Sequence, residues 1–308
     1  MSLTEDVNGV CTRQNMDDMI RLLRARARIY DRVKVAQRLY FAFTLFLPAA
    51  AVIVVRFSEF EFLRSWISLI ALVVGLSDTI VFDRWRKEQV QIAAKLQEQF
   101  DTAVLKLPWN SFVAGEGVDA EVINRFGSKI FASERELELR NWYPKSVEPL
   151  PLSSARFVCQ RTNLWYDSNL RSLYRTCLIA LGWIYFSILA VFALGSTLSE
   201  FILTVMVPFG PFAIWVIREV QRQADTIKLV VRLKNEVHGS LNKFQASDDQ
   251  VKLLSRAREL QDAIYLHRAS SPLVSNLVYR FKRSSLESEM DAGAQWFIDR
   301  LNSNGDGQ

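Results

Sequence analysis

Four charge-poor apolar runs constrain the fold of this chain more than any other feature. They cover residues 39–55, 65–82, 177–198 and 201–217. Each is long enough, or nearly so, for a helix to cross the ~30 Å hydrocarbon core of a bilayer. Because backbone polar groups cannot stay unpaired in lipid, each run is predicted to be helical, and the short gaps within each pair predict two hairpins. The sequence therefore predicts an all-α membrane protein with four transmembrane helices in two hairpins and long cytoplasmic helical extensions.

Basic residues beside the apolar runs predict the orientation. Residues 13–38 hold eight Lys or Arg, and more basic residues follow the second run, precede the third and follow the fourth. The opposite side offers only Arg56 and Arg64. Both termini and the segment between the hairpins are therefore predicted to be cytoplasmic. The N-terminal stretch lacks the features of a cleavable signal peptide, so the first apolar run is expected to direct insertion itself.

This reading divides the chain into five parts. They are a basic cytoplasmic helix at 1–38, a first transmembrane hairpin at 39–82, a cytoplasmic helical domain at 83–176, a second hairpin at 177–217 and a cytoplasmic helical tail at 218–308. Within the cytoplasmic parts, a short helix is predicted at 119–126, a capping box at Ser133 and Glu136, a proline-rich linker at 141–152, a helix at 251–268 and disorder at 302–308.

Composition narrows the function classes. The net charge of +5 suggests nucleic acid as a partner, but most of the excess lies where membrane topology already requires it, so DNA is not an expected partner. The remaining positive charge suits anionic lipid head groups or a phosphate-bearing ligand. The three cysteines lack the spacing of a metal site and are predicted to be free thiols. The two histidines fit no hydrolase motif, and no nucleotide-binding glycine motif occurs, so we expect neither an enzyme nor a cofactor or metal.

Two features inside the apolar runs are candidates for pore lining or gating. Asp78 near the end of the second run is either a pore-lining or inter-helix carboxylate or a residue that reaches the membrane interface. Pro208, Gly210 and Pro211 in the fourth run form either a hinge or a static kink.

The richest polar and aromatic clusters lie in two cytoplasmic segments, 159–174 and 96–110. Asp167 and Arg171, four positions apart, can pair along one helix face. Arg161 can likewise lie over the ring of Trp165 in a cation–π contact. These contacts serve either stability alone or a site where arginines meet phosphate and aromatic rings stack on a base. The candidate ligand-binding residues are Arg161, Asn163, Trp165, Tyr166, Asp167, Arg171, Trp109 and Asn110.

The segments LQEQFDTAVLKLPWN and VCQRTNLWYDSNLRSLY, together with LQDAIYLHR at 260–268, resemble the SMODS-associating four-transmembrane effector family. The resemblance implies a bacterial anti-phage effector of the cyclic-oligonucleotide type (CBASS), linked to a nucleotidyltransferase (CD-NTase) that makes a second messenger. It further implies an inner-membrane protein that binds a cyclic di- or trinucleotide and damages the bilayer. A narrow four-helix unit would need several chains to form a sizeable pore, so a homo-oligomer is expected.

Two other function classes remain open from the residues alone. One is a constitutive ion channel or transporter, although the apolar runs hold few ionisable groups for such a role. The other is a membrane-anchored scaffold whose cytoplasmic helices recruit a partner protein.

Overall fold

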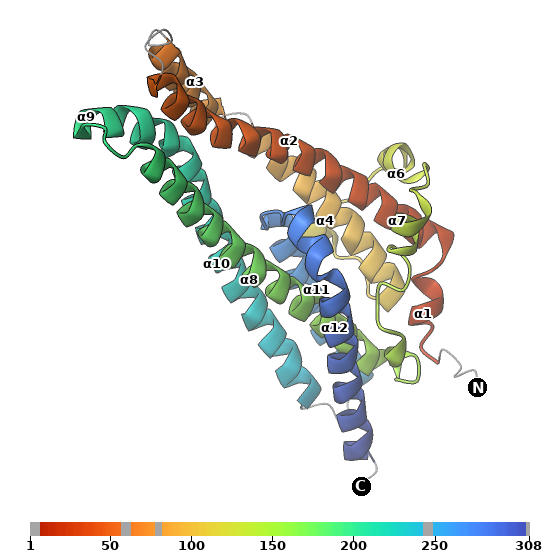
Figure 1. The fold of residues 1–308 in the computed structure, drawn as a ribbon. Helices are drawn as coiled ribbons and strands as arrows, with labels where there is room; N and C mark the ends of the chain where they lie inside the picture. The colour runs from red at the N-terminus through yellow and green to blue at the C-terminus, as the bar shows by residue number, and fades with distance from the viewer. Residues whose placement is uncertain (1–6, 57–62, 78–81, 243–248, 306–308) are drawn as a thin grey trace. The chain divides into compact units, whose positions relative to one another are not determined.

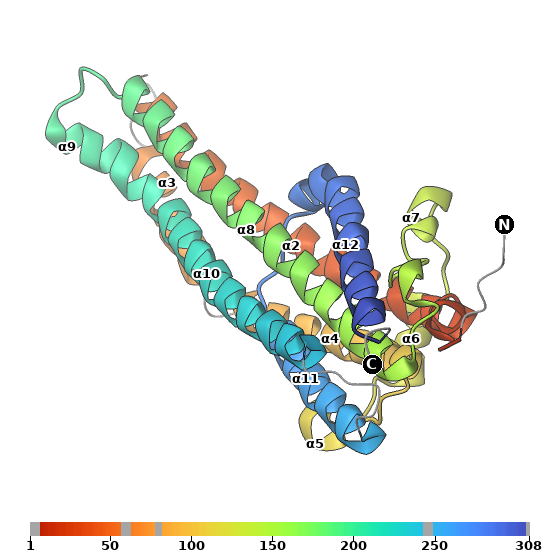
Figure 2. The same cartoon turned by 90° about the horizontal axis from the view of Figure 1, so that it is seen from below.

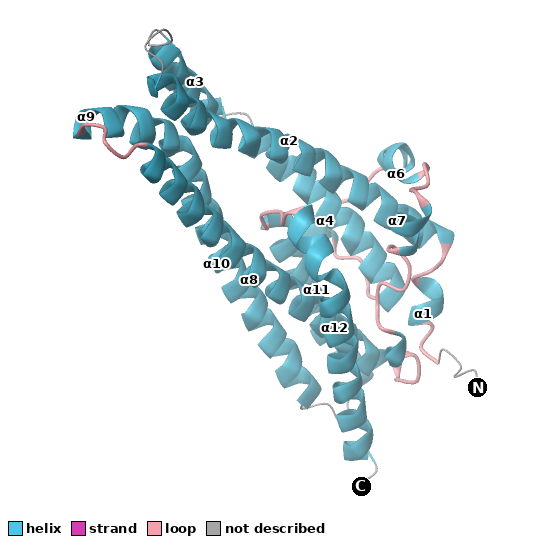
Figure 3. Ribbon diagram, viewed as in Figure 1, coloured by secondary structure: helices cyan, strands magenta, loops and turns pink. Residues whose placement is uncertain are grey.

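The structure, a computed structural model, describes residues 7–56, 63–77, 82–242 and 249–305. All regular secondary structure in these ranges is helical (Figure 3), as the sequence predicts. In chain order the elements in Figure 1 are α1 (Val10–Arg13), α2 (Asp17–Arg56), α3 (Leu63–Ser77), α4 (Asp83–Leu105), α5 (Ser111–Ala114), α6 (Ala120–Gly127), α7 (Ser133–Leu137), the 3₁₀ turn η3 (Lys145–Val147), α8 (Leu152–Phe192), α9 (Leu198–Phe201), the π-helical turn η4 (Ile202–Met206), α10 (Val207–Asn242), α11 (Gln250–Ser270) and α12 (Asn276–Gly305).

The chain divides into two compact units. The first unit comprises residues 1–31, 89–171 and 226–308, and the second unit comprises 32–88 and 172–225. Helices α2, α4, α8 and α10 each contribute residues to both units. At 41 residues, α8 is ~60 Å long, given a rise of ~1.5 Å per residue.

A single apolar core holds the first unit together. Its fully buried members recur at helical spacing, such as Ile20 and Leu23 in α2 and Leu96 and Phe100 in α4. The ring of Phe100 stacks on Tyr143 from the proline-rich linker, with centroids 6.2 Å apart. Because each such side chain contributes ~1.5–3 kcal/mol when fully buried, this core fixes the linker and the helices around it.

Gly127 ends α6 where that helix meets α2. A Cβ atom built on Gly127 would lie 2.6 Å from the carbonyl oxygen of Arg21 and 2.8 Å from its Cγ. Only a residue without a side chain permits this approach. The predicted short helix at 119–126 is thus confirmed, and its terminal glycine brings α6 against α2.

The second unit exposes much of its apolar surface. Large outward-facing side chains occur on all of its long helices, among them Phe46, Trp66, Trp183 and Ile214. A helix of the described chain that is long and apolar enough to cross a membrane spans residues 152–191. The described ranges contain no second helix that meets both criteria. The prediction of four transmembrane helices in two hairpins therefore remains a prediction, and Asp78 lies outside the described residues.

Helices α8 and α10 run side by side within the second unit, as Figures 1 and 2 show. At Gly182 of α8, a Cβ would lie in ordinary van der Waals contact with Val216 of α10, at 3.5 Å. Nearer the α8–α9 connection, Leu189 packs with Val205 of η4 in a small buried cluster. The hydroxyl of Tyr185 donates a hydrogen bond to the carbonyl of Leu45 in α2.

The turn after α8 carries a capping box. Thr197 accepts a hydrogen bond from the backbone N–H of Glu200 at 3.3 Å, and the Glu200 carboxylate accepts one from the N–H of Thr197 at 2.9 Å. The third apolar run was expected to stay helical through residue 198, but α8 ends at Phe192 and the capping box starts a new helix.

The two candidate hinge prolines have different environments. Pro208 is buried and lies in the first turn of α10, directly after the π turn η4, whereas Pro211 lies inside α10. A proline cannot donate to the carbonyl four residues earlier, and the wider π turn accommodates this gap. Around Gly210, a Cβ would meet nothing within 4 Å. The hinge or static kink at these three residues stays a prediction.

Asp83 joins α4 to α10 within the second unit. Its carboxylate pairs with Arg86 and with Lys87 at 2.8 Å in α4, and with Arg222 of α10 at 3.2 Å. Burial acts to raise the pKa of Asp83, but the hydrogen bond from Lys87 and the charges of Arg86 and Arg222 outweigh it and hold the pKa at about 2. The cluster lies just after the second apolar run.

Two local predictions were wrong. Ser133 does not form a capping box, because α7 is preceded by Ala132 and shows no side-chain cap, while Glu136 accepts a hydrogen bond from Arg24 of α2 at 2.7 Å. The C-terminal segment was expected to be disordered from residue 302, yet α12 continues to Gly305.

Candidate ligand site

The three segments that carry the family resemblance meet in the first unit. Each supplies side chains to one buried polar cluster, which we call the buried network. Its members are Glu98 and Asp101 of α4, Gln160 of α8, Arg258, Gln261 and Arg268 of α11, and Tyr143 of the linker. Because the bonded partners Asp101 and Arg268 lie 167 positions apart, only the tertiary fold brings them together.

Asp101 lies at the centre of the buried network and is fully buried. One carboxylate oxygen accepts hydrogen bonds from Gln97 Nε2 at 2.7 Å and from the Tyr143 hydroxyl at 2.8 Å. The other accepts from Gln261 Nε2 at 3.1 Å and from the Arg268 guanidinium. Four donors therefore converge on one carboxylate.

Glu98 forms the second acidic group of the buried network. It accepts from Arg258 at 2.6 Å and from Gln261 at 2.8 Å. Arg258 also pairs with Asp262 at 2.8 Å, and Asp262 accepts from the side chain of Asn110 at 2.8 Å. Asn110, a candidate ligand residue, thus fixes the loop after α4 to α11.

Burial and charge act against each other in this cluster. Burial raises the pKa of Glu98, although Arg258 opposes the shift. Burial alone would lower the pKa of Arg268, but the adjacent Asp101 carboxylate outweighs it and raises that pKa. Breaking such a buried pair by removing one partner costs ~3–5 kcal/mol, because the remaining charge loses its counterion.

A second polar chain links α8 to the end of α11. Asp167 pairs with Arg171 at 2.8 Å, which confirms the predicted pair, and the same oxygen lies 2.9 Å from His267 Nε2. Arg171 also donates to the carbonyl of Pro272 at 2.7 Å. Burial would raise the pKa of Asp167, but Arg171 and His267 outweigh it and hold the pKa well below its usual range.

Ser271 extends this chain, so that a serine, a histidine and an aspartate follow one another as in a hydrolase triad. The Ser271 hydroxyl lies 3.0 Å from His267 Nδ1, but it also donates to the carbonyl of His267 at 2.6 Å. Ser271 and His267 are both buried. A hydroxyl that donates to a helix carbonyl and is buried away from solvent is a poor nucleophile. The Ser271 hydroxyl therefore serves to satisfy a free carbonyl at the C-terminal end of α11.

The remaining candidate ligand residues do not gather in one place. Arg161 lies over the ring of Phe297 in α12 at 3.8 Å, and this contact replaces the predicted one with Trp165. Asn163 approaches the Tyr143 hydroxyl at 3.5 Å. The ring of Tyr166 meets Tyr279 of α12 edge-on, with centroids 6.4 Å apart. Trp109 donates to the carbonyl of Gly115 at 2.9 Å.

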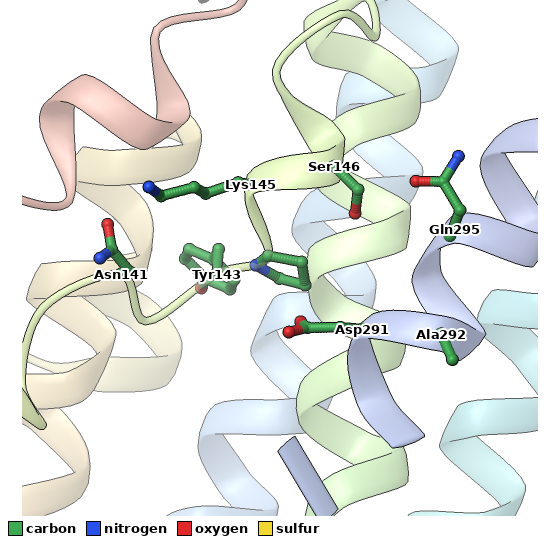
Figure 4. Close-up of a pocket in the computed structure, with 8 residues that line it drawn as sticks. Asn141, Tyr143, Lys145, Ser146, Asp291, Ala292 and Gln295 are labelled. Atoms are coloured by element: carbon green, nitrogen blue, oxygen red, sulfur yellow. The ribbon is translucent and has the colours of Figure 1, made fainter. Parts of the chain in front are cut away.

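Among the described residues, a pocket of about 510 Å³ opens between the proline-rich linker and α12, and the sequence did not predict it (Figure 4). Its lining residues are Asn141, Tyr143, Pro144, Lys145, Ser146, Asp291, Ala292 and Gln295. The sequence predicts a proline-rich linker in the first segment and only a weak helical pattern in the second. Only the fold shows that the linker and α12 face each other. Tyr143 belongs both to this pocket and to the buried network.

These observations define an all-helical protein whose first unit is built around a buried charge network and whose second unit exposes apolar surface suited to a membrane. The sequence profile of the SMODS-associating 4TM effector domain matches residues 8–297. The chain belongs to this family of four-transmembrane effectors, and the resemblance noted in its sequence is confirmed.

A relative from Bacillus cereus (strain VD146), named a probable CBASS effector molecule, is 24% identical over 293 residues. The alignment covers 90% of this chain and 94% of the relative. No solved structure matches the chain.

Proposed function

We propose that this chain is a membrane effector of bacterial anti-phage defence, activated by a cyclic oligonucleotide messenger from a partner nucleotidyltransferase. On activation it oligomerises and permeabilises the inner membrane, so that the infected cell dies or stops growing. It acts by changing conformation and not by catalysis, and it needs no cofactor. Family membership and the name of the Bacillus cereus relative support the defence role.

The apolar surface of the second unit supports the membrane role. Large side chains such as Phe46 and Trp183 are more than half exposed, and extensive exposure of large apolar side chains marks a surface that contacts protein or membrane. In a bilayer the same side chains face hydrocarbon. In this proposal the chain crosses the membrane four times with both termini in the cytoplasm, so that the first unit lies in the compartment where a messenger is made.

One observation carries the proposal of signal transmission: α2, α4, α8 and α10 each belong to both units. A change in how α4, α8 and α11 meet in the buried network would move helices that continue into the second unit. A messenger drives this change only if it binds one arrangement more tightly than the other. A rearrangement of the buried network would have to re-pair its charges, because partly satisfied buried polar networks are costly.

The test is to express the chain with its neighbouring nucleotidyltransferase and to follow membrane potential with a voltage-sensitive dye. We expect depolarisation and growth arrest only when an active nucleotidyltransferase is present. The matched control is the same pair with an inactive nucleotidyltransferase. Depolarisation in that control would favour a constitutive channel, and an intact potential in both cultures would contradict the proposal.

A further inference from the structure

The pocket between the linker and α12 presents hydrogen-bonding groups of opposite kinds at its two sides. In Figure 4 Asn141 and Lys145 lie at one side, and Ser146, Ala292 and Gln295 lie at the other. Asp291 projects from α12 towards the linker. All of these residues belong to the first unit.

One side offers donors. The Asn141 side-chain oxygen already accepts from Asn15 at 3.0 Å, so its amide N–H groups are left to face a ligand. The Lys145 ammonium forms no ion pair with any residue that the structure describes. An ammonium beside an amide donor suits a phosphate oxygen.

The other side offers acceptors. Gln295 donates its amide to Asp299 at 2.8 Å, which leaves its carbonyl oxygen to accept. The Asp291 carboxylate has no cationic or hydrogen-bonding partner within the described ranges. The Ser146 hydroxyl has no hydrogen-bond partner there either.

The acceptor side discriminates between bases. Guanine presents two adjacent N–H donors on one edge, which a carboxylate accepts together, whereas the amino group of adenine adjoins a ring acceptor that a carboxylate repels. The volume of about 510 Å³ lies within the ~300–1,000 Å³ typical of ligand pockets. The rings of Tyr143 and Pro144 supply an apolar wall for the base.

We propose that this pocket binds one guanine nucleotide unit of the messenger, with Asp291 and Gln295 accepting from the base and Lys145 contacting the phosphate. The assignment rests on the proposed function, and it moves the ligand site away from the residues that the sequence favoured. The assignment also connects messenger binding to α4, because Tyr143 lines the pocket and its hydroxyl donates a 2.8 Å hydrogen bond to Asp101 of α4.

The experiment is titration calorimetry on the full chain in lipid nanodiscs. The probes are cyclic di-GMP, cyclic GMP–AMP, cyclic di-AMP and cyclic tri-AMP. The variants are Asp291→Asn, which keeps the shape and replaces an acceptor by a donor, and Lys145→Ala. Their matched controls are Glu289→Gln, exposed on the same helix, and Lys129→Ala, exposed outside the pocket.

We expect the wild-type chain to prefer a guanine-containing probe. Asp291→Asn should weaken its binding about tenfold and erase the preference over cyclic di-AMP, because a charged hydrogen bond is lost. Lys145→Ala should weaken every probe that binds by a similar factor, and both controls should bind like the wild type. Unchanged melting temperatures will show that the variants fold.

The failures of the two proposals are distinguishable. If the wild type binds a probe and Asp291→Asn and Lys145→Ala bind it equally well, the pocket assignment is wrong while messenger binding stands. Preference for an adenine-only probe would overturn the guanine assignment. If no cyclic nucleotide binds the wild type, messenger activation itself fails, and the pocket assignment with it.

Discussion

Replacing Asp101 by asparagine tests whether the buried network holds the first unit together. The side chain keeps its shape, but one acceptor oxygen becomes an amide donor that faces two other donors. Arg268 loses its counterion whichever oxygen is replaced, because an amide carries no charge. If Oδ2 becomes the amide nitrogen, Arg268 and Gln261 each lose an acceptor. If Oδ1 becomes the amide nitrogen, Gln97 and Tyr143 each lose an acceptor.

The magnitude follows from these contacts. Each buried donor left without an acceptor costs ~1–3 kcal/mol, and removing one member of a buried ion pair costs ~3–5 kcal/mol. We therefore expect Asp101→Asn to lower the free energy of unfolding by about 3–5 kcal/mol. Chemical denaturation in detergent micelles, followed by circular dichroism, measures it.

A matched control removes an ion pair from the surface. Glu88→Gln breaks the exposed contact between Arg84 and Glu88 at 3.4 Å, which should cost at most ~1 kcal/mol. Adding Arg268→Gln to Asp101→Asn should cost less than the sum of the two single changes, because each single change leaves a partner unpaired. If Asp101→Asn changes stability no more than Glu88→Gln does, the network does not stabilise the unit as argued.

Three further outcomes are expected. Gly127→Ala should lower the free energy of unfolding by ~1–3 kcal/mol because the new Cβ would meet the backbone of α2. Gly293→Ala, which has open space around it, should not destabilise the protein. Equal melting temperatures for the two variants would contradict this. Asp83 contributes stability that is present above its unfolded pKa of ~3.9 and is lost as the pH falls towards its folded pKa of about 2, so Asp83→Asn should flatten the acid limb of a stability–pH curve. A double-mutant cycle of Arg161→Gln and Phe297→Leu should give a coupling of ~0.5–2 kcal/mol for their cation–π contact, and no coupling would refute it.

The sequence predicted the helices well because helical periodicity is a local signal. The predicted helix at 251–268 is α11 within two residues at each end, and the Asp167–Arg171 pair follows from spacing along one helix. The capping box predicted at Ser133 is absent because α7 is capped by Ala132, which places Ser133 inside the helix. The Glu136 carboxylate accepts instead from Arg24, distant in sequence, and from the N–H of Phe131.

The candidate site was harder to predict because its contacts are tertiary. Asp101 and Arg268 lie 167 residues apart, and nothing in either local pattern pairs them. Arg161 was matched to a ring on its own helix, but α12 brings Phe297 closer. The pocket is formed by a linker and a helix with weak patterning, so its residues carried no signal before the fold was known.

The π turn at Ile202–Met206 has a consequence for how the fourth apolar run can move. A π turn holds one residue more than an α turn over nearly the same axial length. If that surplus residue were to migrate along the helix, each position it passed would rotate by ~100° about the axis, since an α-helix has 3.6 residues per turn. Phe209 and Phe212 now meet Tyr185, with ring centroids 5.9 and 5.1 Å apart. Passage of the surplus residue beyond them would turn both rings out of that contact and present different side chains to α8, without unfolding the helix or sliding it along its length.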